Sequence, residues 1–468
     1  MGERPGTVIT LGDAKSSENL KKERNQFLPR EYGQSSAKTD STLSMKTIVL
    51  LFAWVMIPAL AFAGKHPKPT PTPTPAPTPV TVGINGNEPL LAAAPDGTLY
   101  ISALQHIYSS TNSGATWTEL LGPIYASSIN LNSDSSISVD PGNRLYFTFD
   151  YPYAGTTAVC TSDDRGITWN CNPAVVPGGT DRMWTLAPTM TDDYETTNEG
   201  LYETAFLHST DRGSTWTPTS IGAGLLEPQT GPLLQIPGSS NVLQITKIFG
   251  TLPQEVPELK LYVYSPNSTG SIIAAVRSTG LPIPVALPSA ALGKNGELWV
   301  ASEETNPAGG VQVVLAHSTN EGVTWSKLAP IPGTATGTAT FTWVAAGSPG
   351  HVGVIYYYTP DNGHDSTSMT NSTWAAMWAE SFNATSPTPT WTVTVVEPNV
   401  HAGAICAAAG CSGDNRFSGD FINALIDTND VAHLTWMKED MSTQATTIRY
   451  ERIKASPPST TTTTGKGN

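Results

Sequence analysis

The octapeptide SDDRGITW at 162–169 decides the fold of this 468-residue chain, because three close copies of it occur elsewhere. The copies are STNSGATW at 110–117, STDRGSTW at 209–216 and STNEGVTW at 318–325, and all four fit the pattern S-x-[DN]-x-G-x-T-W. Four matches of this length in one chain are very unlikely to arise by chance. The chain is therefore built on a structural repeat.

Each conserved type of residue in the pattern has a local physical role. The Asp or Asn side chain can accept hydrogen bonds from backbone amides across a tight turn. The Gly adopts positive φ at no steric cost, and the Trp begins the next strand and buries its ring between neighbouring sheets. Each octapeptide therefore predicts a β-hairpin turn, capped by Asn112, Asp164, Asp211 or Asn320.

The spacing of the octapeptides predicts how the hairpins are arranged. The first three tryptophans recur about every 50 residues, and Trp325 follows after about twice that distance. One repeat has therefore lost its octapeptide, near 264–269. A period near 50 residues with strand-and-turn patterning predicts an all-β fold of the β-propeller type, in which each repeat forms one blade.

A second recurring element, a turn followed by a strand of the type D-G-x-L-Y-I, supports this prediction. It occurs at 96–101, 142–147, 199–202, 239–245, 295–300, 349–355 and 428–434. We therefore expect seven blades within 81–455, with six as the alternative if the last segment only completes an earlier sheet. The two ends of this region should meet in one blade, because closing the ring removes free sheet edges.

The regions outside 81–455 are of other kinds. Residues 1–44 form a polar extension, and 45–63 combine a lysine, an apolar run and an A-F-A ending, which is typical of a secretory signal peptide. Residues 64–80 form a Thr/Pro linker, and 456–468 form a low-complexity tail. We expect a secreted, periplasmic or cell-surface protein with no membrane span in its mature form; a retained N-terminal anchor is the alternative.

The charge and the cysteine content exclude some classes of function. The formal net charge is −14 with only 14% charged residues, which argues against nucleic-acid binding because phosphate binding needs clustered cations. Four cysteines fit an oxidising compartment. Cys160 and Cys171 flank one hairpin, so we expect a disulfide bridge across its two strands, and Cys406 and Cys411 lie close together in a Gly/Ala-rich loop, where a second bridge could close a small ring. No spacing typical of a metal site is present, so we expect no metal and no other cofactor. We also expect a monomer.

The octapeptides resemble the Asp-box (bacterial neuraminidase) repeats of sialidase-type propellers. Further stretches resemble secreted sialidase-like bacterial proteins: NEP at 87–89, DRMW at 181–184, FTWVAAG at 341–347, HAGAIC at 401–406 and NRFSGDF at 415–421. The resemblance implies a β-propeller whose Asp-box turns lie on the face away from the active site. It therefore implies structural roles for the four capping residues.

Sialidases also share a set of catalytic requirements. They need three arginines that bind the substrate carboxylate, a Tyr nucleophile paired with a Glu, and an Asp acid/base. No F-R-I-P type motif precedes the first repeat of this chain, where 85–90 contain no arginine. Arg182, Arg416 and Arg277 are the remaining candidates for an arginine triad, so glycoside hydrolase activity of the exo-sialidase type stays an open prediction.

A propeller most often binds its ligand where loops enter the innermost strands. Segments at such positions contain the candidate catalytic carboxylates Glu88, Asp134, Asp181 and Asp420. They also contain the candidate substrate-binding residues Arg182, Trp184, Trp343 and Arg416. Aromatic rings could stack on sugar rings while charged groups bind hydroxyls. In the alternative interpretation, the tryptophans pack between blades and the charged residues form structural ion pairs.

Two functional hypotheses follow. The first is an exported sialidase-like propeller that recognises extracellular glycans or polysaccharides, with glycosidase activity unproven because no clear arginine triad is present. The second is a non-catalytic scaffold at the cell surface that binds protein or polysaccharide. The geometry of the charged residues around the innermost strands discriminates between these hypotheses.

Overall fold

The computed structural model describes residues 77–454 except 124–133, 152–155, 178–179, 200–202, 222–228, 249–257, 267–271, 285–286, 328–329, 364–365 and 407–416. All described residues belong to one compact unit. The polar extension, the predicted signal peptide, the tail and most of the Thr/Pro linker lie outside the described residues.

The described part is an all-β structure with one short 3₁₀ helix, η1 (Ser366–Ser368). Five antiparallel sheets have four strands each. They are β2 (Leu90–Ala93), β3 (Leu99–Ala103), β4 (His106–Ser110) and β5 (Thr118–Leu120); β6 (Ser135–Val139), β7 (Leu145–Tyr151), β8 (Thr156–Ser162) and β9 (Asn170–Pro177); β10 (Thr180–Leu186), β11 (Asp193–Glu199), β12 (Glu203–Ser209) and β13 (Thr217–Ile221); β14 (Gln229–Gln235), β15 (Val242–Ile248), β16 (Glu258–Pro266) and β17 (Ile272–Leu281); and β26 (Asn423–Ile426), β27 (Ala432–Glu439), β28 (Thr446–Ile453) and β1 (Val80–Gly83).

The sixth sheet has eight strands, and it corrects the predicted blade count. Its members are β18 (Ser289–Leu292), β19 (Leu298–Thr305), β20 (Val311–Ser318), β21 (Ser326–Lys327), β22 (Thr338–Ala346), β23 (Val352–Thr359), β24 (Thr373–Ser381) and β25 (Thr392–Ala402). The prediction of seven blades is therefore wrong: the described strands form five four-stranded blades and this larger sheet.

The larger sheet is continuous because two glycines let its halves approach closely. Its antiparallel halves, β18–β21 and β22–β25, are joined only by the parallel pair of Val311 with Thr338. A side chain on Gly310 would collide with the backbone carbonyl of Gly337. This local approach of two backbones could not be recognised from the spacing of the repeats.

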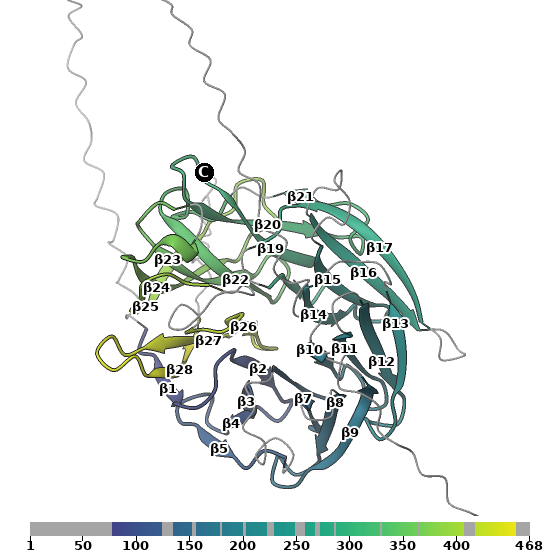
Figure 1. The fold of residues 1–468 in the computed structure, drawn as a ribbon. Coiled ribbons are helices and arrows are strands. Elements are labelled where there is room, and N and C mark those ends of the chain that lie inside the picture. Colours follow the sequence, from purple (N-terminus) through teal and green to yellow (C-terminus); the bar gives the residue numbers. More distant parts are fainter. Residues whose placement is uncertain are drawn as a thin grey trace, which may run out of the picture. The chain divides into compact units, whose positions relative to one another are not determined.

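The sheets are arranged as a β-propeller (Figure 1). The first strands of the five four-stranded sheets and of the two halves of the larger sheet contact one another in the closed order β2, β6, β10, β14, β18, β22, β26 and back to β2. Each first strand begins at the same end of the ring, which we call the strand-entry end. Since strands alternate in direction, the turns between third and fourth strands lie at the opposite end, called here the octapeptide end.

The two ends of the described chain meet in one sheet, as predicted. Strand β1 pairs with β28, so that Val80 lies opposite Tyr450. The N-terminal strand thereby covers an edge that would otherwise be free to pair with another chain. The largest hydrophobic cluster includes residues from this sheet and from most others; its fully buried tryptophans are Trp374, Trp378 and Trp436.

The four octapeptides form turns between third and fourth strands, with the hydrogen bonds that their sequence predicts. In the turn from β8 to β9, Asp164 accepts hydrogen bonds from the backbone amide of Thr168 at 2.8 Å and from its hydroxyl at 2.6 Å. Gly166 has φ 83°, and the preceding Arg165 is also left-handed at 63°. The hydroxyl of Ser162 accepts a hydrogen bond from the amide of Gly166 at 2.8 Å.

A fifth turn has equivalent hydrogen bonds although its sequence does not fit the octapeptide pattern. Between β24 and β25, Asn383 accepts hydrogen bonds from the amide and the hydroxyl of Thr390, at 2.8 and 3.0 Å. The hydroxyl of Ser381 donates to Asn383 at 3.2 Å, and Trp391 packs against the nearby core. Extra residues between Asn383 and Thr390 displace the Thr-Trp pair, so a search at fixed spacing does not find it.

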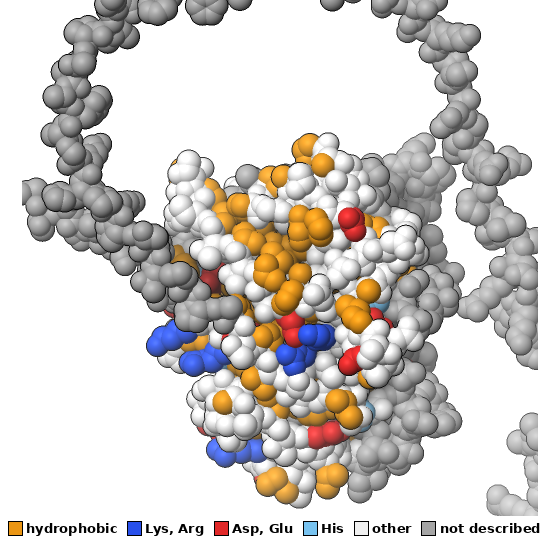
Figure 2. Space-filling model, turned by 90° about the vertical axis from the view of Figure 1, so that its left-hand side faces the viewer, with side chains coloured by type: hydrophobic (Ala, Val, Ile, Leu, Met, Phe, Trp, Pro, Cys, Tyr) orange, Lys and Arg blue, Asp and Glu red, His pale blue; other side chains and the backbone are white. Residues whose placement is uncertain are grey.

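The predicted bridge between Cys160 and Cys171 is present and joins β8 to β9. Cys406 is also disulfide-bonded, and Cys411, its predicted partner, lies outside the described residues. One face of the molecule shows Lys and Arg side chains beside acidic ones near its centre, with hydrophobic side chains alongside (Figure 2). Within the described residues, no helix is long and apolar enough to cross a bilayer.

Candidate functional site

Charged side chains from four sheets meet at the strand-entry end. Glu88, Asp134 and Asp420 precede β2, β6 and β26, and Arg182 lies on β10. The guanidinium of Arg182 donates to the carboxylate of Asp420 at 2.8 Å, and its backbone amide donates to Asp134 at 3.2 Å. The backbone amide of Asp420 donates to Glu88 at 2.9 Å. We call these four residues, together with Lys247 and Glu303, the strand-entry cluster.

The backbone places two members of the cluster through unusual conformations. Arg182 has φ 55° and sits where the register of β10 against β11 shifts, so it belongs to a β-bulge. Glu88 has φ 54° just before β2. A left-handed non-glycine residue costs on the order of 1 kcal/mol or more and persists only when its surroundings hold it. Bulges of this kind often redirect a side chain at a functional site.

Two further members, Lys247 and Glu303, were not predicted from the sequence. They lie near the ends of β15 and β19, and both are buried. Burial lowers the pKa of Lys247 to about 8, while the charges of Glu303 and Asp420 oppose that shift and Arg182 adds to it. No motif surrounds either residue, so only their burial beside Arg182 and Asp420 identifies them.

The strand-entry cluster is thus a compact set of two cationic and four acidic side chains. Glu88, Asp420, Lys247 and Glu303 are each about 5% exposed or less, and the side chain of Arg182 is 15% exposed. Charges so far removed from water form strong, directed hydrogen bonds. Its partly exposed members, Arg182 and Asp134, can donate to and accept from the hydroxyl groups of a sugar.

The predicted aromatic residues lie next to the cluster but are packed together. The rings of Trp184, Trp343 and Phe421 form a trio with centroids 5.5–5.8 Å apart. Trp184 and Trp343 are only 2% and 4% exposed, and the indole of Trp184 donates to the carbonyl of Thr230 at 2.9 Å. This arrangement favours the alternative in which the tryptophans pack between sheets.

The remaining predicted site residues are not seen at the strand-entry cluster. Arg416 and the side chain of Asp181 lie outside what the structure describes. Arg277 lies on the outer strand β17 and donates to the carbonyl of Glu321 at the octapeptide end. Among the described residues, Arg182 is therefore the one triad candidate at the strand-entry end, and no arginine triad is assembled there.

The four predicted capping residues of the octapeptides lie away from the strand-entry cluster. Asn112, Asp164, Asp211 and Asn320 each cap their own turn at the octapeptide end. The hydroxyl and the backbone amide of Thr168 hold the pKa of Asp164 at about 2. Within the described residues, no group of three or more His, Cys, Asp or Glu side chains could hold a metal ion.

Comparisons with known proteins identify the fold. No family model and no curated protein matches the chain. An ulvan lyase of a polysaccharide lyase family, solved with -[GlcA(1-4)Rha3S]-, is 12% identical and aligns over 79% of this chain and 95% of its own, with a TM-score of 0.50. YCF48 bound to D1 peptide is 12% identical over 81% and 98%, with a TM-score of 0.48. The NanB sialidase from Streptococcus pneumoniae is 13% identical over 83% and 71%, with a TM-score of 0.41.

The protein is a β-propeller. At these identities the likeness concerns the fold alone and does not transfer a reaction. Function must therefore be argued from the side chains of this chain, and the strand-entry cluster is the part of the described structure on which that argument rests.

Proposed function

We propose that this propeller recognises carbohydrate at its strand-entry end. The observation that carries the proposal is the convergence of Glu88, Asp134, Arg182 and Asp420, which come from four different sheets, into one hydrogen-bonded set. Carboxylates accept and guanidinium groups donate hydrogen bonds, and a sugar presents many hydroxyls that can do both. Ligand sites of propellers also lie most often on loops that a rigid scaffold positions.

The comparison with the ulvan lyase adds support at the level of ligand class. That polysaccharide lyase has the same fold and was solved bound to -[GlcA(1-4)Rha3S]-. We propose that a polysaccharide is also the ligand here. The finer assignment, that the octapeptides are Asp-box repeats of a sialidase-like protein, is supported by their sequence resemblance and by their place at the end of the propeller opposite the cluster.

We favour recognition without sialidase-type turnover. The described residues supply one arginine at the strand-entry end, whereas that mechanism needs three to bind the substrate carboxylate. Arg182 is also paired with Asp420 at 2.8 Å, which occupies part of its hydrogen-bonding fork. The carboxylates Glu88, Asp134 and Asp420 remain the residues to test for any glycosidase activity.

The first prediction concerns Arg182. Arg182→Lys keeps a cation beside Asp420 but removes the planar fork that binds anionic groups, so we expect binding to acidic glycans to weaken about tenfold or more. A glycan array followed by calorimetry on the best ligands measures the change. Aryl glycosides, including a sialoside, test for turnover in parallel.

Arg165→Lys is the matched control for this prediction. Its side chain is 60% exposed at the octapeptide end and pairs with Asp96, so this exchange should leave glycan binding unchanged. Equal effects of both exchanges, or the absence of any glycan binding by the wild-type chain, would rule out carbohydrate recognition at the strand-entry cluster. Hydrolysis of a sialoside would overturn the non-catalytic part of the proposal.

We also propose that the chain is exported. The bridge between Cys160 and Cys171 supports this proposal because such bridges persist mainly in oxidising compartments. If 45–63 is a cleaved signal peptide, the mature chain begins at Gly64 and appears in the extracytoplasmic fraction. Fractionation and N-terminal sequencing measure this. An intact N-terminus in the cytoplasmic fraction would contradict export.

A further inference from the structure

A cavity of about 1170 Å³ lies at the octapeptide end, between the sheets β10–β13 and β14–β17. One wall comes from the β10–β11 turn, from β11 and β12, and from the octapeptide at 209–216; the other comes from the turn between β14 and β15. The cavity is larger than the roughly 300–1,000 Å³ of most small-molecule pockets. A ligand that fills it is therefore larger than a single sugar ring or metabolite.

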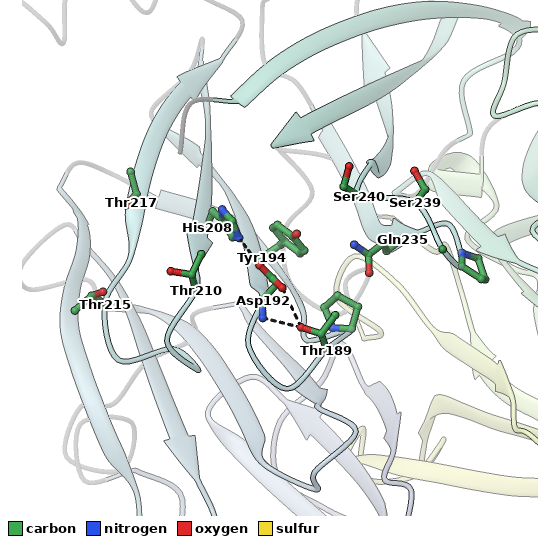
Figure 3. A pocket seen from close by; sticks show the side chains of 13 residues that line it. Thr189, Asp192, Tyr194, His208, Thr210, Thr215, Thr217, Gln235, Ser239 and Ser240 are labelled. Atoms are coloured by element: carbon green, nitrogen blue, oxygen red, sulfur yellow. Dashed lines mark hydrogen bonds and ion pairs between the residues drawn. The ribbon is translucent and has the colours of Figure 1, made fainter. Parts of the chain in front are cut away.

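The chemistry of the lining is mostly uncharged and hydroxylated. Side-chain hydroxyls come from both walls, and Gln235 adds an amide (Figure 3). The threonine and serine hydroxyls that line the cavity are those of Thr189, Thr210, Thr215, Thr217, Ser239 and Ser240. Hydroxyl and amide groups both donate and accept hydrogen bonds, so the lining matches a ligand whose own groups do both.

Among the described residues of the lining, the charged or titratable groups besides Tyr194 are Asp192 and His208, and they are held in place. Asp192 accepts a hydrogen bond from the hydroxyl of Thr189 at 3.2 Å and pairs with the imidazole Nε2 of His208, also at 3.2 Å. The ring of His208 stacks on that of Tyr194 with centroids 4.8 Å apart. In Figure 3, Tyr194 lies between His208 and Gln235.

This lining is poorly suited to three other classes of ligand. An anion would meet the Asp192 carboxylate, with no lysine or arginine among the described lining residues to bind it. A divalent cation would find one carboxylate instead of several. An apolar molecule would leave many hydroxyls without partners.

We infer that this cavity is a second carbohydrate site, which binds a neutral oligosaccharide of two or more sugar units. It lies at the end of the propeller opposite the strand-entry cluster and does not depend on the function proposed for that cluster. Asp192 and His208 bind sugar hydroxyls, the Ser and Thr hydroxyls of both walls complete the hydrogen bonds, and the two sheets form the sides of the groove.

The test uses the full chain and four neutral probes: the tetrasaccharides of cellulose, xylan, starch and mannan. Saturation-transfer NMR detects binding, and calorimetry measures its affinity. Ser240→Trp should block the cavity from an exposed position, and Asp192→Asn should remove the charged acceptor. We expect each exchange to weaken binding about tenfold or more. Ser214→Ala, in the same octapeptide but outside the lining, is the matched control.

The outcomes separate the two sites. Binding that Ser240→Trp and Asp192→Asn reduce, and that Ser214→Ala and Arg182→Lys leave unchanged, supports the second site. The absence of binding to all four probes at Kd below about 10 mM overturns it. Binding that Arg182→Lys reduces and Ser240→Trp does not also overturns it, and assigns recognition to the strand-entry cluster alone. Thermal unfolding of each variant confirms that it is folded.

Discussion

Replacing Glu397 with alanine is expected to destabilise the folded chain by about 3 kcal/mol, because it removes several hydrogen bonds to charged groups and leaves the partly exposed Arg449 and Lys438 without their counter-ion. Glu397 is 5% exposed. Its carboxylate accepts hydrogen bonds from Lys438 at 2.9 Å, from Arg449 at 3.0 and 3.1 Å, and from the indole of Trp436 at 3.1 Å. The contacts join β25 to β27 and β28.

The same network extends to the start of the propeller. The guanidinium of Arg449 also donates to the carbonyl of Pro79 at 3.0 Å and to the hydroxyl of Thr81 on β1. One carboxylate therefore orients an arginine that holds the closing strand in its sheet. Loss of Glu397 should loosen β1 as well as the contact between the two sheets, which makes the expected effect larger than that of one hydrogen bond.

Urea unfolding followed by tryptophan fluorescence measures this change. Glu119→Ala is the control, since Glu119 pairs with His106 on the surface, with its side chain 41% exposed, and such pairs contribute at most about 1 kcal/mol. A Glu397→Ala variant no less stable than the Glu119→Ala variant would contradict the prediction. Hydrogen exchange at 80–83 would report the loosening of β1 separately.

The second large effect concerns Asp193, where replacement by asparagine should stabilise the chain at alkaline pH. Asp193 is fully buried on β11, and burial raises the pKa of its carboxyl to about 7, against the opposing effect of the Tyr146 hydroxyl. The unfolded chain has the ordinary pKa of about 4. The folded state therefore keeps a proton on Asp193 between these two values, and its stability falls as pH rises from about 4 through 7.

Asparagine keeps the shape of the side chain and cannot ionise, so the exchange removes the loss of folding stability that occurs as pH rises. We expect Asp193→Asn to match the wild type near pH 4 and to exceed it by up to about 4 kcal/mol at pH 8. Glu195, two residues along, behaves in the same direction: complete burial raises its pKa well above the usual range, and neither of its carboxyl oxygens has a hydrogen-bond partner among the described residues.

Unfolding of both proteins at pH 4 and pH 8 gives the result directly. Met190→Leu is the control, since Met190 is exposed in the turn between β10 and β11 and neither side chain ionises; its effect on stability should not change between these pH values. If the difference in stability between the wild type and Asp193→Asn were the same at both pH values, Asp193 would be ionised in the folded state and the prediction would be wrong.

Local interactions explain which features could be predicted from the sequence. The octapeptide turns were predictable because each one closes its hydrogen bonds within eight residues, as Asp164 does with Thr168. The bridge between Cys160 and Cys171 spans the same hairpin. The turn at 381–391 is closed by similar hydrogen bonds, but extra residues between Asn383 and Thr390 mean that its sequence does not match the octapeptide pattern.

The candidate site was predictable only in part. Glu88, Asp134, Arg182 and Asp420 were found because they precede or begin strands, which is a property of position along the chain. Lys247 and Glu303 carry no such mark, and they join the cluster only because the ends of β15 and β19 reach it. The sequence left open whether Trp184 stacks on a ligand or on Trp343. The burial of both rings and their packing against each other favour the second arrangement.

The sequence by itself therefore determined that this chain is a ring of capped hairpins, since the turn chemistry and the repeat spacing are encoded within short segments. Only the tertiary structure decided which charges meet. Arg182 and Asp420 are 238 positions apart and touch because the ring closes. Glu397, Asp193 and the cavity beside Asp192 likewise owe their environments to sheets packed side by side, and burial of that kind is a property of the assembled ring.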